Sequence, residues 1–151
     1  MQEIVDTAFA ITKYHKDNQH KKRHAILIIV DDFAARPDIL HAAGGSILNT
    51  LAIRGRHANI SFWVASQRPT LLSTVLRTQA TSLCVFRQRS VRDLMSSLDE
   101  CSAVVDKKTL EAVYNYATSK PYGFMMVDLM RPIDQMFHAN LDKRMIPQVA
   151  E

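Results

Sequence analysis

The sequence predicts an α/β fold with a mainly parallel β-sheet and flanking helices. Short apolar runs alternate along the 151 residues with segments whose apolar positions have helical spacing. The run "ILIIV", Ile26 to Val30, holds five consecutive aliphatic residues and shows no polar alternation. Strands of parallel sheets are buried on both faces and have this composition, so we expect a central, fully buried strand there.

Five helical segments are expected from apolar spacing and from the residues that end them. They are Gln2 to about Lys16, "ILNTLAIRGRH" up to Gly55, a short helix after Pro69, "SVRDLMSSL", and "DKKTLEAVYNYATS" with Asp106 as its N-cap. The polar, basic stretch Lys16 to His24 is expected to be a solvated connector.

Five strands are expected between these helices. They are Ile26 to Val30, Ile60 to Ser66, Ser82 to Phe86, "YGFMMVDL", and "IDQMFHA" as an edge strand. Phe62 and Trp63 have apolar neighbours and are expected in the core rather than on a base-stacking surface. No repeat or low-complexity segment interrupts the pattern, so we expect a single domain over residues 1–151.

Charge and cysteine content narrow the classes of function. Nineteen Lys and Arg against fifteen Asp and Glu give a net charge of +4 and a pI near 9.2, which mildly favours an anionic partner such as nucleic acid or nucleotide. Two cysteines without a CxxC motif indicate a reduced, intracellular protein without a zinc site. Apolar runs are too short for a membrane span, so a soluble protein is expected.

Polar side chains follow two of the predicted strands. Asp31 and Asp32 come directly after the first, and Ser66 and Gln67 end the second. Ligands of α/β sheets bind at the carboxyl ends of the strands, where an aspartate can hold Mg²⁺ against nucleotide phosphates and its neighbour can orient water. Each pair also has an ordinary interpretation, as a strand end or as a side chain that binds loop backbone.

These stretches resemble a known family. "ILIIVDDF", "LAIRGRHANISFWVASQRPT" and "VLRTQATSLCVFRQRSVRDLMSSLD" are similar to the second half of the FtsK/HerA superfamily of DNA-pumping P-loop ATPases, over roughly Ala25 to Asp128. The Asp-Asp ending and "GRHANIS" look most like the poxvirus-type genome-packaging ATPases of large DNA viruses. The resemblance implies an incomplete P-loop core of the RecA/FtsK type, with ATP and Mg²⁺ as cofactors.

The resemblance also implies residue roles and partners. Asp31 would be the Walker B magnesium ligand, Asp32 the catalytic acid, and Gln67 the sensor of the γ-phosphate beside Ser66. Arg77 and Arg87 are similar to basic positions that reach nucleotide or a neighbouring subunit, although Arg87 is equally compatible with a surface position. The implied partners are double-stranded DNA, further copies in a ring, and viral capsid or portal components.

One part of the family pattern is absent. A P-loop requires GxxxxGK followed by Ser or Thr, and none of the four glycines is followed by lysine. Either the P-loop lies on residues outside this sequence, which we favour, or the chain is a degenerate relative without turnover. A non-catalytic assembly subunit and a cellular chromosome-segregating or conjugative pump are the rival interpretations.

Overall fold

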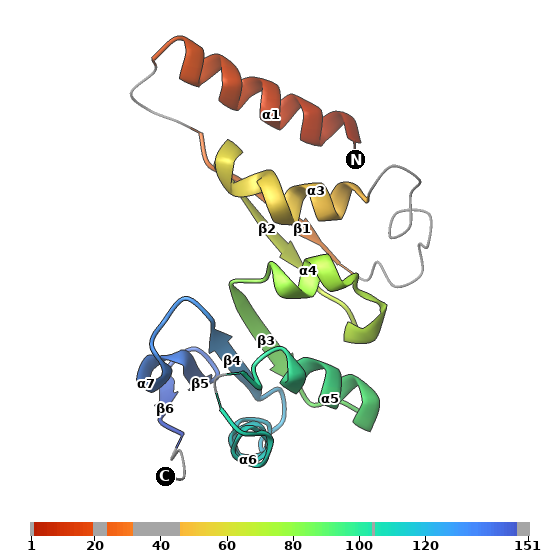
Figure 1. Ribbon diagram of the computed structural model, residues 1–151, viewed down its shortest axis with the longest axis vertical. Coiled ribbons are helices and arrows are strands. Elements are labelled where there is room, and N and C mark those ends of the chain that lie inside the picture. Colours follow the sequence, from red (N-terminus) through yellow and green to blue (C-terminus); the bar gives the residue numbers. More distant parts are fainter. Residues whose placement is uncertain (1, 20–23, 32–45, 104, 148–151) are drawn as a thin grey trace. The chain divides into compact units, whose positions relative to one another are not determined.

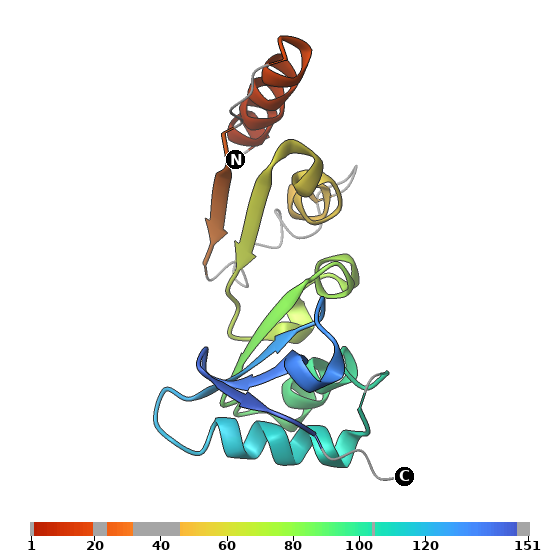
Figure 2. The same cartoon turned by 90° about the vertical axis from the view of Figure 1, so that its left-hand side faces the viewer.

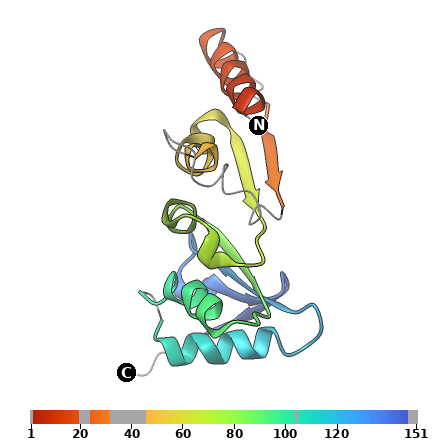
Figure 3. The same ribbon diagram turned by 90° about the vertical axis from the view of Figure 1, so that its right-hand side faces the viewer.

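The computed structural model describes residues 2–19, 24–31, 46–103 and 105–147. The chain divides into two compact units, Met1–Gln79 and Ala80–Glu151, which we describe separately. Figures 1, 2 and 3 show the elements of both units from three directions. The prediction of a single partial ATPase domain is not tested by this division and stays a prediction.

The first unit is built on a parallel pair of strands, β1 (Ile26–Val30) and β2 (Ile60–Val64). Between them the chain forms α3 (Ile47–Arg54) and a 3₁₀ helix, η2 (Gly55–Ala58). The α3 helix begins where the Ser46 hydroxyl accepts a hydrogen bond from the Leu48 amide at 3.2 Å. Asn59 then turns the chain into β2 with a left-handed φ of 56°.

Helices cover one face of this strand pair. The α1 helix (Gln2–Asp17) packs Val5 and Ala8 into a cluster with Leu51, Ala58 and Ile60. At the other end Val30, Leu48 and Leu76 form a second cluster, to which α4 (Thr74–Thr78) contributes after the 3₁₀ helix η3 (Pro69–Leu71). Figure 2 shows α3 alongside the pair. The predicted helices of this unit and both predicted strands are therefore present.

None of the described residues covers the opposite face of the pair, contrary to the expectation that Ile26 to Val30 is buried on both sides. Leu27 and Ile29 are 49% and 62% exposed, and Trp63, opposite Ile29, is 63% exposed. Trp63 was expected in the core, and that prediction was wrong because alternate side chains of a strand point to opposite faces. Its neighbour Phe62 does pack against the core.

The second unit contains a four-stranded antiparallel sheet. Its strands are β3 (Ser82–Phe86), β4 (Phe124–Asp128), β5 (Phe137–Ala139) and β6 (Lys143–Met145), in the order β3-β4-β5-β6. The described sheets are thus a small parallel pair and a larger antiparallel sheet with helices, so the α/β class holds while the mainly parallel sheet does not.

The connection between β3 and β4 explains the reversal. In a parallel pair, a single crossover helix carries the chain back to the end of the sheet where the first strand began. Here two helices lie between β3 and β4, α5 (Val91–Asp99) and α6 (Lys107–Ala117). Phe86 at the end of β3 faces Phe124 at the start of β4, so the connection leaves and re-enters the sheet at the same end. β4 therefore runs antiparallel to β3.

The helices of the second unit cover one face of its sheet. Leu98, Leu110 and Tyr114 pack with Val127 and Phe137 in one buried cluster. The Asp106 carboxylate accepts a hydrogen bond from the Thr109 amide at 3.0 Å, which confirms Asp106 as the N-cap of α6 and lowers its pKa.

The predicted edge strand "IDQMFHA" differs from the structure in two respects. Its first half is a helical turn, α7 (Ile133–Met136), and only its second half is a strand. That strand, β5, is paired on both sides, by β4 and by β6. A further strand in the polar tail, β6, takes the edge position instead. None of the described helices is long and apolar enough to cross a membrane.

Exposure of Trp63 is testable by fluorescence, since it is the only tryptophan of the sequence. We expect acrylamide to quench its emission nearly as strongly as that of a free tryptophan amide, because its side chain is largely exposed. The matched control carries Trp63→Phe with Phe62→Trp, which moves the indole to the packed face and weakens quenching. Equal protection in the two proteins would contradict the uncovered face.

Burial of Cys101 predicts a loss of stability at alkaline pH. Burial, aided by the charge of Glu100, raises the pKa of this thiol from 9.0 to about 11. The unfolded chain loses this proton above pH 9 while the folded chain keeps it, so the free energy of unfolding falls between these pKa values, by at most about 3 kcal/mol. Denaturant titrations of wild type and Cys101→Ala at about pH 8 and about pH 10.5 should show a smaller drop in the variant.

Candidate functional site

The candidate site lies at the carboxyl end of the parallel pair in the first unit. β1 and β2 are in register from Ile26 opposite Ile60 to Val30 opposite Val64. The Ala65 amide extends the pairing by donating to the Val30 carbonyl at 2.8 Å. The residues after both strands, Asp31 on one and Ser66 with Gln67 on the other, therefore leave the pair at the same edge.

The predicted site residues differ in their exposure and in their hydrogen bonds. Asp31 and Gln67 are exposed, as a group that meets a ligand must be. The Ser66 hydroxyl accepts from the Arg68 amide and donates to the Arg68 carbonyl, both at 3.2 Å, so it closes its own turn. Asp32 lies outside the described residues. Ser66 thus has a local role, and among the predicted site residues that the structure describes at this edge, Asp31 and Gln67 are the exposed ones.

Arg77 is anchored at the same end of the first unit. It follows Leu76, which shares a buried cluster with Val30, the residue before Asp31. Its helix α4 begins at Ser73, whose hydroxyl accepts from the Leu76 amide at 3.2 Å and donates to Asn49 on α3 at 2.6 Å. Arg77 is half-buried, with Nη2 3.5 Å from the Thr74 hydroxyl. Arg87 is exposed and belongs to the second unit, after β3.

The oxygen ligands at this edge suit a weakly bound hard cation such as Mg²⁺ rather than a metal ion coordinated only by protein side chains. No group of three or more His, Cys, Asp or Glu side chains among the described residues is arranged to hold a metal ion. Mg²⁺ is commonly held by one or two carboxylates together with substrate phosphates and water. Asp31 fits one such carboxylate, and the phosphate oxygens would have to come with the ligand.

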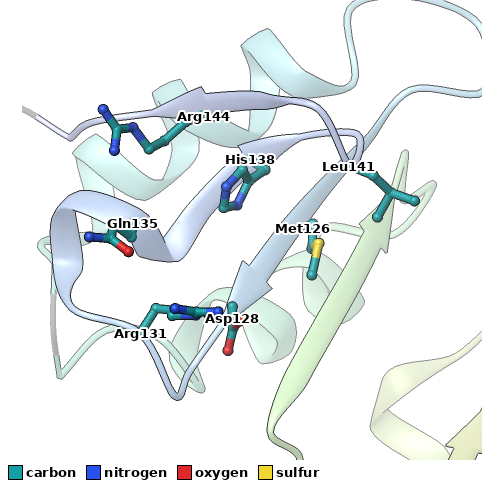
Figure 4. A pocket seen from close by; sticks show the side chains of 7 residues that line it. All are labelled: Met126, Asp128, Arg131, Gln135, His138, Leu141 and Arg144. Carbon is teal, nitrogen blue, oxygen red and sulfur yellow. Dashed lines mark ion pairs between the residues drawn. The ribbon is translucent and has the colours of Figure 1, made fainter.

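A second feature lies in the other unit, on the sheet that includes β4. An open pocket of about 400 Å³ is lined by Met126, Asp128, Arg131, Gln135, His138, Leu141 and Arg144 (Figure 4). None of these residues was singled out from the sequence. The available signal was the alternation of "FMMVD" and "FHA", in which every second residue faces away from the core.

Comparison with known proteins adds no family assignment. The chain matches no model of a protein family. A search of curated proteins likewise finds no match.

The position of Arg77 should depend on Ser73. Ser73→Ala removes both the cap of α4 and the bond to Asn49, and we expect it to lower the free energy of unfolding by about 1 to 2 kcal/mol. Denaturant unfolding measures this change. The matched control is Ser61→Ala at an exposed position of β2, which should change the free energy of unfolding by less than about 0.5 kcal/mol. Equal effects of the two changes would contradict the anchoring role of Ser73.

Proposed function

We propose that this chain is part of an ATP-hydrolysing motor that moves double-stranded DNA, of the kind that packages viral genomes. The observation that supports the proposal best is the parallel register of β1 and β2, which brings Asp31 and Gln67 to one edge. Nucleotide sites of α/β sheets form at such an edge. The resemblance of the surrounding sequence to FtsK/HerA ATPases supplies the reaction class.

In this proposal Asp31, Asp32 and Gln67 have different roles in ATP hydrolysis. Asp31 holds Mg²⁺ against the phosphates of ATP, and Asp32 orients the attacking water. Gln67 senses the γ-phosphate from the end of β2. Phosphoryl transfer depends mainly on positioning and on neutralising charge, so two carboxylates and an amide are sufficient protein contributions on this side of the nucleotide.

The other side of the nucleotide needs groups that this sequence does not contain. Backbone amides of a glycine-rich loop and its lysine cradle the phosphates in P-loop ATPases, and no GxxxxGK is present here. The proposal therefore requires a P-loop supplied by other residues. Arg77 or Arg87 would complete the site of a neighbouring copy in a ring, with capsid or portal components as further partners.

A second candidate is a non-catalytic or degenerate subunit that assembles with a motor. The absence of GxxxxGK favours it, since a chain without a P-loop has no known means of holding the triphosphate in this family. Among related motors, a cellular chromosome or conjugation pump would use the same edge in the same way. The viral and cellular forms share one mechanism and are separated by their genomic neighbours.

The test restores a P-loop segment to the chain and measures DNA-stimulated ATP hydrolysis. We expect Asp32→Asn to lower kcat by at least about 100-fold, because it removes the group that prepares water. Asp17→Asn, which neutralises an exposed carboxylate at the end of α1, is the matched control and should keep full activity. Full activity of Asp32→Asn would remove Asp32 from the mechanism.

The 151-residue chain without an added P-loop provides the contrasting measurement. Calorimetry should detect no micromolar binding of Mg-ATP, because half of the phosphate contacts are missing. Micromolar affinity would contradict the need for a separate P-loop. A P-loop-restored chain that folds but never hydrolyses ATP, with or without DNA, would favour the non-catalytic subunit.

A further inference from the structure

The antiparallel sheet of the second unit has one face that the described helices of this unit do not cover. The core side carries Val85, Met125 and Phe137. Since side chains alternate along a strand, the other side carries Cys84, Met126, His138 and Arg144, which the strand register places in one row from β3 to β6. We call this side the open face.

An aromatic pair stands beside this row. Phe86 on β3 and Phe124 on β4 are direct cross-strand partners, and their ring centroids are 4.9 Å apart at an interplanar angle of 37°. Phe86 remains 51% exposed although it is fully apolar. Each ring lies two residues along its strand from the row, so the pair adjoins Cys84 and Met126 on the same face. Exposed apolar patches rimmed by polar residues mark interaction sites.

Hydrogen-bond donors surround the pocket on the same face. Figure 4 shows the His138 ring pointing into the space between β4, α7 and β6. Its Nδ1 is buried and has no hydrogen-bond partner among the described residues. Gln135 and Arg144 add donors from the neighbouring elements. Arginine, histidine and glutamine side chains are typical ligands of phosphate oxygens.

The one carboxylate of the pocket is already neutralised. Asp128 lies 3.6 Å from the Arg131 guanidinium, and its Oδ1 accepts from the Met130 amide at 3.1 Å. Among the described residues that line the pocket, Arg144 is therefore the cation with no carboxylate beside it in the lining. Its neighbour Lys143 points to the opposite side of β6, where it contacts the Tyr116 hydroxyl and ring on α6.

We propose that the open face binds single-stranded nucleic acid. An unpaired base stacks on Phe86 and Phe124, and a phosphate of the same strand is held at the pocket by Arg144, His138 and Gln135. Stacking on a flat aromatic surface requires bases that are not paired in a duplex, and base stacking together with cationic contacts is the usual mode of single-strand recognition. This proposal is independent of the ATPase function proposed for the first unit.

The test uses the whole chain and a fluorescein-labelled oligothymidylate of about 12 nucleotides, with binding followed by anisotropy. Phe86→Leu keeps an apolar side chain but loses the ring, and should weaken binding at least about fivefold, whereas Phe86→Tyr keeps it. No loss with Phe86→Leu would overturn the stacking role and with it the proposal.

Arg144→Gln and Lys143→Gln form a matched pair, since both remove one positive charge from adjacent positions on β6. We expect Arg144→Gln to weaken binding and to reduce the slope of log affinity against log salt by about 0.7, the value for one contact to a single-stranded phosphate. Lys143→Gln should leave the slope unchanged. Equal slopes in the two variants would overturn the proposed phosphate contact, because a merely structural effect does not alter counterion release.

Competition experiments identify the ligand class. Unlabelled single strand should displace the probe, while a duplex of the same length, thymidine monophosphate and inorganic phosphate should compete only weakly. A duplex that competes as well as the single strand would overturn the proposal. Equal competition by the mononucleotide would do the same, since it would assign the pocket to a small phosphate ligand.

Discussion

The parallel pairing of β1 with β2 is the constraint on which the first unit depends. Five aligned residue pairs and the bond from the Ala65 amide to the Val30 carbonyl fix where both strands end. Shifting β1 by one residue against β2 would turn the side chain of Ile28 away from the helices and toward the uncovered face. The same register sets the distance along the sheet between Asp31 and Gln67. The register of β1 and β2 therefore determines both the packing of the core and the positions of the candidate site residues.

The uncovered face of this pair has a physical cost that isolated strands cannot avoid. Parallel sheets are ordinarily covered on both faces, and two strands alone are marginally stable. Leu27, Ile29 and Trp63 expose apolar side chains on one continuous side of the pair. Further strands or helices from other residues would bury them, and a P-loop half of an ATPase core would contain such elements. The proposed function thus offers an explanation for the exposure, which the quenching of Trp63 can follow once a P-loop segment is restored.

Local pattern was sufficient to predict most elements but not how they pair. Helical spacing and the Asp106 cap predicted α1, α3, α5 and α6, and the apolar runs predicted β1 to β4. The direction of β4 depends on the two helices between it and β3. Both helices were predicted from the sequence, but the composition of a strand does not indicate the direction in which it pairs. Trp63 was misplaced because β2, "ISFWV", was interpreted as an apolar strand, whereas its polar residue Ser61 shares the exposed side of the strand with Trp63. The pocket was missed because its residues meet only across three strands and α7.

Net positive charge by itself could not have located a nucleic-acid surface on this chain. Arg87, Arg89 and Arg92 are exposed in the second unit, as are Lys143 and Arg144 on its edge strand. What distinguishes Arg144 is its face: it shares the open side of the sheet with Phe86 and Phe124, whereas Lys143 is turned toward Tyr116 on α6. A cation attracts phosphate of any nucleic acid, but a cation beside an exposed aromatic pair discriminates for strands whose bases can leave the duplex. Recognition on this face therefore follows from the alternation of the strand rather than from the excess of basic residues.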